Sequence, residues 1–354
     1  MKNNKVLWSF IALLLAVLTI FLVMRGSGMS WELVFEGLSQ ASPVWLVLAF
    51  LSMAGIIVFE GKALCVILEE VGYKRPLRSG ILYSAADAYF SAITPSATGG
   101  QPGSAFFMIR DGISAPVSAA ALLVNLVLYT VALAVWGIVC IAACPGLFEL
   151  FNPGGKILIA AGYTILLVQV AVFLLALMKP ALLSKIMRAL IRLLHRLHLM
   201  RHPDRWIAKL EKMLQEYADC VKVISDRPRM LWKAFFWNMM QRFCQFCGVV
   251  FVYRALAGPW KNVMKLFSMQ CLIYIGVYSV PIPGSMGATD LMMLDGYLSM
   301  MKRETAFRLQ MLSRGVTFYC CVLASGVIVL TGYLITKNGR KRNTVTKEQK
   351  ETSM

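Results

Sequence analysis

The chain has 354 residues, of which 58% are hydrophobic, and its mean hydropathy is +0.66. Several apolar runs approach the roughly 20 residues that a helix needs to cross a bilayer, so the composition excludes a water-soluble domain and indicates a multi-pass membrane protein. The net charge of +18 lies mainly beside these runs, which favours contact with anionic lipid over direct binding of nucleic acid.

Six apolar runs have the length of a full crossing, and we expect each of them to form a transmembrane helix. They are Val6–Met24, Val44–Leu64, Pro116–Ala143, Ile157–Met178, Leu231–Leu256 and Met311–Thr336. The first run follows two lysines but has no small-residue cleavage site. We therefore interpret it as a retained helix rather than a signal peptide.

Two further apolar segments, 79–111 and 263–301, are interrupted near their middle by TPSATGGQPG and VPIPGSMGATD. Their arms are too short to span a bilayer. If each segment crossed the membrane once, either the basic loop 179–233 or the basic tail 337–354 would lie outside, against the positive-inside tendency. Both segments are therefore predicted to be re-entrant helical hairpins.

This pattern predicts one all-α polytopic membrane domain over residues 1–354, with two halves of opposite orientation, 1–143 and 157–336. An inverted repeat with paired interrupted helices is typical of transporters, whose substrate site lies near the midplane. The loop 179–233 carries 13 basic and five acidic residues. We expect this loop, the tail 337–354 and both termini to face the cytoplasm.

The basic loop contains a stretch with helical periodicity, ALLSKIMRALIRLLHRLHLM. Its basic residues fall on one face and its leucines on the other, which predicts an amphipathic helix in the membrane interface that contacts anionic phospholipids. The basic residues of this face are Lys185, Arg188, Arg192 and Arg196.

The two interruptions provide the first candidate binding residues. Prolines end the helical arms, glycines permit close backbone approach, and polar side chains can satisfy freed amides or a ligand. These residues are Thr94, Pro95, Ser96, Gly99, Gly100, Gln101 and Pro102 in the first break, and Pro281, Pro283, Gly284, Gly287 and Asp290 in the second. The helix after each break points its positive end toward the midplane, which suits a phosphate or carboxylate.

An alternative interpretation is that both breaks are structural kinks whose polar groups cap their own helix ends. For Asp290, an N-terminal cap and a role in binding substrate or a cation both stay open at this point.

The predicted span from Leu231 carries a polar face. Its members, at positions i, i+3, i+4 and i+7, are Asn238, Gln241, Arg242 and Gln245. A buried arginine is costly in a membrane, so Arg242 is predicted to hold a lipid phosphate or to form a structural ion pair with Asp87, Glu60 or Asp290. Asp87 and Asn125 are weaker candidates for the same interior set, whereas Glu60 and Lys62 are expected to reach the interface by snorkelling.

Motifs for metal, cofactor or catalytic chemistry are not found in the sequence. His195, His198 and His202 have no carboxylate or thiolate to complete a metal site. NPGGKIL lacks the spacing and the hydroxyl of a phosphate-binding loop, and no Ser/His/Asp or HExxH pattern occurs. We therefore expect no metal, no cofactor and no catalytic residue set.

The motifs TPSATGGQP and PIPGSMGATD give the chain a family resemblance that extends from the first span to the last. It resembles the lysylphosphatidylglycerol synthase transmembrane domain family, the flippase-like module of the bacterial multiple peptide resistance factor. The chain has Gln101 where the family often has an acidic residue, and Asp290 where the family often has Glu. The resemblance implies a plasma-membrane protein that moves phospholipid or aminoacylated phosphatidylglycerol between leaflets.

The resemblance also leaves alternatives for function and partners. One is a phosphatidylglycerol lysyltransferase acting from lysyl-tRNA, or the membrane subunit of such an enzyme; another is a carrier for a small soluble anion. The chain ends shortly after the last predicted span, so we do not expect transferase activity from it alone. A separate aminoacyl transferase as partner and a homodimer stay open.

Overall fold

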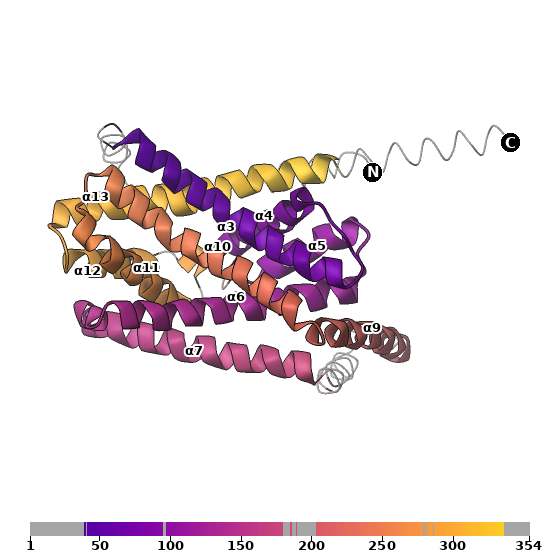
Figure 1. Ribbon diagram of the computed structural model, residues 1–354. Helices are drawn as coiled ribbons and strands as arrows, with labels where there is room; N and C mark the ends of the chain where they lie inside the picture. Colours follow the sequence, from indigo (N-terminus) through magenta and orange to yellow (C-terminus); the bar gives the residue numbers. More distant parts are fainter. Residues whose placement is uncertain are drawn as a thin grey trace, which may run out of the picture.

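The computed structural model describes residues 39, 41–94, 97–179, 185, 189, 203–278, 280, 282–285 and 287–335. Every element within these residues is a helix (Figure 1), as predicted. Lys185 lies in a helix and is exposed. Other predictions fall outside the described residues: the span Val6–Met24, the tail 337–354, Pro95, Ser96, Pro281, Arg188, Arg192 and Arg196.

Four helices are long and apolar enough to cross a membrane, and each corresponds to a predicted span. They are α3 (Pro43–Glu70), α6 (Ala115–Ala143), α7 (Pro153–Met178) and the helix Arg303–Ile335, which comprises α13 (Arg303–Arg314), the π-helical turn η5 (Gly315–Cys320) and a continuation. Prolines in their first turns help to start α3, α6 and α7. The described chain is therefore that of a multi-pass membrane protein.

Helix α10 (Pro228–Ala255) is as long as α3 and packs along it (Figure 1). It carries more polar residues than the four apolar helices, and its crossing of the membrane stays a prediction. The amphipathic helix α9 (Pro203–Ser225) precedes it and packs against the start of α6, where the Ser114 hydroxyl donates a hydrogen bond to Glu216.

The first interrupted segment folds into two antiparallel helices, α4 (Leu77–Ile93) and α5 (Gly100–Arg110). The Ser104 hydroxyl donates to the carbonyl of Tyr83 at 2.5 Å, and the Tyr83 hydroxyl donates to the Asp111 carboxylate at 2.6 Å. The 11 residues of α5 extend about 16 Å, roughly half the hydrocarbon thickness.

The second interrupted segment forms a comparable pair, α11 (Val263–Val277) and α12 (Ala288–Leu298). The Tyr297 hydroxyl donates to the Gln270 amide oxygen at 3.0 Å, and Gly276 faces Met292, so these helices are also antiparallel. Both segments thus have the paired shape that their short arms suggest. Re-entry into the membrane and the opposite orientation of the two halves remain predictions.

Each helical pair is packed in its own apolar cluster. Tyr83, Phe107 and Met108 belong to the first, and Met269 and Met292 belong to the second. Helix α6 contributes its first half to the first cluster and its second half to the other, so it joins the two pairs into one body. This packing brings the interrupted ends of both pairs to the middle of the molecule.

Candidate functional site

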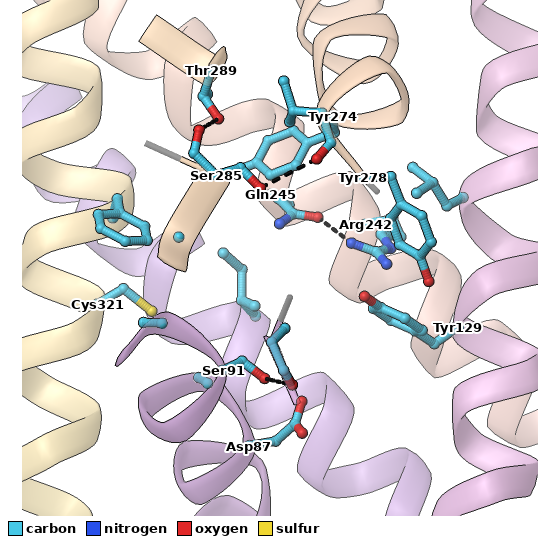
Figure 2. A pocket seen from close by; sticks show the side chains of 18 of the residues that line it. Asp87, Ser91, Tyr129, Arg242, Gln245, Tyr274, Tyr278, Ser285, Thr289 and Cys321 are labelled. Carbon is cyan, nitrogen blue, oxygen red and sulfur yellow. Dashed lines mark hydrogen bonds between the residues drawn. The ribbon is translucent and has the colours of Figure 1, made fainter. Parts of the chain in front are cut away.

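The interrupted ends of both helical pairs meet in a cavity of about 530 Å³ (Figure 2). Ala97 and Gln101 line it from the first break, and Ile282, Gly284 and Ser285 line it from the second. Its remaining walls come from α3, α4, α6, α7, α10, α11, α12 and the helix Arg303–Ile335. The two breaks, which are far apart in sequence, thus contribute to one space.

The predicted polar face of α10 points into this cavity. Gln241, Arg242 and Gln245 line it, whereas Asn238 is fully buried behind it. The Asn238 amide nitrogen donates to the side-chain oxygen of Asn125, a cavity residue on α6, at 3.0 Å. Asn238 therefore joins α10 to α6, while the other three members of the face are available to a ligand.

Arg242 lies in the wall of the cavity and is 4% exposed. Its Nη1 donates to Gln245 at 2.6 Å, and its guanidinium carbon lies 3.8 Å from the centre of the Tyr129 ring (Figure 2). Its Nε and Nη2 have no hydrogen-bond partner within the part of the chain that the structure describes. Among the described residues no acidic side chain lies within 4.0 Å of it. Arg242 therefore forms none of the ion pairs suggested by the sequence, with Asp87, Glu60 or Asp290.

Two carboxyl groups lie on another wall of the cavity, Glu60 on α3 and Asp87 on α4. The expectation that Glu60 snorkels to the interface is wrong. Its helix continues to Glu70, about 15 Å beyond it, and Glu60 is 6% exposed and accepts hydrogen bonds from Ser84 and Gln241. Lys62, on the same helix, is exposed.

Most candidates of the first break stabilise the break itself. The Thr94 hydroxyl donates to the Phe90 carbonyl at 2.7 Å and accepts from the Gly99 amide at 2.9 Å. Gly100 packs against α4, where a Cβ would collide with Ser91 and Asp87.

Two further residues of this break have side chains in different surroundings. Gln101 reaches the cavity and donates to Asp87 at 3.2 Å. Pro102 lies in the first turn of α5 and is exposed.

Residues of the second break also stabilise the break itself. Gly284 and Gly287 have positive φ angles, +58° and +75°, which glycine tolerates best. The Gly287 amide donates to Asp290 at 3.1 Å, and Asp290 forms an ion pair with Arg314 at 3.0 Å without lining the cavity. Asp290 thus caps the first turn of α12, as one of its two interpretations expects. Pro283 begins the short turn η4 (Pro283–Ser285).

Several cavity residues were not among the candidates predicted from the sequence. Arg314 is the last residue of α13, directly before η5 and inside a predicted span, so the cost of an intramembrane arginine was a usable signal for it. The π-helical turn, a feature often found at functional sites, has no clear signature in the sequence. The cavity tyrosines, which resemble ordinary core aromatics in sequence, are Tyr129, Tyr274 and Tyr278.

Comparison with known proteins identifies one family. The model of the lysylphosphatidylglycerol synthase TM region matches residues 6–325, most of the chain. No curated protein and no solved structure matches the chain.

Proposed function

The chain belongs to the family of the lysylphosphatidylglycerol synthase TM region, a family of membrane proteins in lipid-modification pathways, and from this premise we propose that it moves phospholipids between the leaflets of the membrane. The lipid headgroup enters the cavity at the two breaks while the acyl chains stay in the surrounding lipid. The membrane in question is the bacterial plasma membrane, with both termini in the cytoplasm.

The observation that supports this proposal most is the burial of Arg242 with two of its nitrogens unpartnered among the described residues. A buried guanidinium with two unpartnered nitrogens lacks the partner that intramembrane charges require. A lipid phosphate has two free oxygens that match the planar fork of arginine, so it can occupy both nitrogens at once. Tyr129 stabilises the cation from its ring face and adds no negative charge that would compete with the phosphate.

Two other features of the cavity agree with a headgroup ligand. Its volume of about 530 Å³ lies within the range of small-molecule sites. The first turns of α5 and α12 reach the cavity through Gln101 and Thr289, so the positive ends of two helices point toward it.

The experiment is reconstitution of the purified protein into liposomes with phospholipids that carry fluorescent labels on short acyl chains. A reagent that quenches only the outer leaflet reports the lipids that change sides. We expect movement without tRNA, and a panel of headgroups identifies the preferred lipid. No movement together with lipid lysylation from lysyl-tRNA would support the transferase alternative, and uptake of a soluble anion that lipid does not compete would support the carrier.

A further inference from the structure

Glu60 and Asp87 form a carboxyl pair that the binding of a phosphate at Arg242 does not by itself require. Both line the same cavity, and Asp87 lies three residues after Ser84, on the face of α4 that contacts Glu60. Glu60 accepts from the Ser84 hydroxyl at 2.8 Å and the Gln241 amide at 3.0 Å, and Asp87 accepts from Gln101 at 3.2 Å. The donors around the pair thus come from α4, α5 and α10.

Among the described residues no cation lies within ion-pair distance of either carboxyl group, so no partner neutralises two negative charges there. The charged and titratable groups that face the pair are Arg242 on α10 and Cys321 on the helix Arg303–Ile335. Arg242 attracts both carboxyls, yet it lies outside ion-pair distance of either and donates to Gln245 instead. Two full negative charges side by side in this position are unfavourable, so one shared proton is the stable state.

The side chain of Gln241 indicates that a proton on the pair can exchange with the cavity. Gln241 is 4% exposed and turns its amide nitrogen to Glu60, which leaves its side-chain oxygen in the cavity wall without a partner. A buried acceptor without a partner marks a place for an entering hydrogen-bond donor, such as water that carries a proton. Glu60 and Asp87 line the same cavity as Arg242, so a proton and an anion share one space.

We infer that Glu60 and Asp87 bind one exchangeable proton between them, and that its binding is coupled to the binding of an anionic headgroup at Arg242. The identity of the anion rests on the proposed function. When the proton leaves, the pair carries two negative charges, which attract Arg242 and repel the phosphate. When the proton binds, one of these charges is removed and the anion binds more tightly.

The sign of the pH effect follows from this coupling. Acidification fills the proton site and favours the headgroup, and by reciprocity the bound headgroup favours the proton. If one proton enters with each headgroup, affinity changes by up to about tenfold per pH unit where the pair titrates. The proton comes from the solution that the cavity faces and leaves to the solution on the other side.

Infrared spectroscopy tests the proton site without any transport. We expect the wild-type protein in lipid to show the C=O band of a protonated carboxyl group at a pH at which surface carboxylates are ionised. Glu60→Gln and Asp87→Asn should each abolish this band. Glu69→Gln, which changes a carboxylate on the same helix with 58% side-chain exposure, should keep it. Absence of the band from the wild-type protein overturns the inference even if the variants fail to fold.

Lipid movement under an imposed pH gradient then separates the two proposals. We expect a gradient to change the rate for a fluorescent phosphatidylglycerol, and a protonophore or Asp87→Asn to remove the dependence. Movement at one rate at every pH overturns the coupling and leaves the translocase standing. A shared proton without lipid movement under any gradient refutes the translocase and supports the proton site alone.

Discussion

Arg242 and Arg314 are both buried arginines of one cavity, but their surroundings differ. Arg242 contacts an amide oxygen and an aromatic face, which keep its positive charge uncompensated. Arg314 forms an ion pair with Asp290, and the side chains of the pair are 7% and 19% exposed. Both guanidiniums have an Nε and an Nη2 without a hydrogen-bond partner among the described residues, so the ion pair alone distinguishes them. The first arginine is therefore suited to an anionic ligand, whereas the second holds α12 to the helix that follows it.

This difference predicts opposite effects on stability. Arg314→Ala leaves the partly buried Asp290 without its partner and should lower the free energy of unfolding by about 3 kcal/mol. Arg242→Ala removes a charge that has no ionic partner, so thermal unfolding in detergent should occur at the wild-type temperature or above it. If Arg242→Ala lowered the free energy of unfolding as much as Arg314→Ala, the proposed difference between the two arginines would be contradicted.

Gly100 illustrates a residue whose importance is steric. The sequence marks it as a break residue, but its Cα hydrogen lies against Ser91 and Asp87 of α4. Gly100→Ala should displace the Ser91 and Asp87 side chains, crowd the Asp87 carbonyl and lower the free energy of unfolding by about 1–3 kcal/mol. Gly315→Ala is the matched control, because among the described residues no atom beyond its own stretch of helix lies within 4 Å of a Cβ at that position. Equal melting temperatures for the two variants would show that the α4–α5 contact is looser than described.

At the scale of elements, prolines and glycines located both interruptions from the sequence, because these residues cannot continue a helix. The end of α3 was harder to predict. The apolar run stops at Leu64, but the helix continues to Glu70, and this extension places Glu60 in the interior. Helix ends beyond an apolar run depend on tertiary packing, and α3 packs against α4 and α10 along this stretch.

Helix α9 allows a test of packing by chemical labelling. Cys220 is 5% exposed, and burial raises the pKa of its thiol from 9.0 to about 11. Below pH 9 its thiolate fraction is therefore about 100-fold smaller than that of an ordinary cysteine, and maleimide labelling should be slower by at least this factor. Labelling should accelerate as the pH approaches 11.

The control for this labelling is Lys222→Cys in a Cys220→Ser background, which presents a thiol at an exposed position of the same helix. It should react rapidly on whichever side of the membrane α9 faces, and our topology predicts the cytoplasmic side. Rapid labelling of Cys220 itself below pH 9 would show that α9 is not packed on α6 as described.

At the scale of the whole molecule, the sequence predicted two breaks with similar chemistry, and the fold brings both to one cavity. The polar face of α10 was predictable because its spacing depends only on helical geometry. The aromatic lining and the contribution of Arg314 depend on how α6, α11 and α13 pack around that face. No local pattern specifies such long-range packing, so these residues emerge only in three dimensions.

The central claim is that lipid headgroups pass through this cavity by way of Arg242. The most direct measurement is the initial rate of leaflet exchange of a fluorescent phosphatidylglycerol in liposomes, compared among wild type, Arg242→Ala and Lys233→Ala. Lys233 is an exposed cation on the same helix. We predict that Arg242→Ala slows exchange by about 10- to 100-fold, the equivalent of one lost charged hydrogen bond, while Lys233→Ala keeps the wild-type rate. Equal rates for all three proteins would contradict the account.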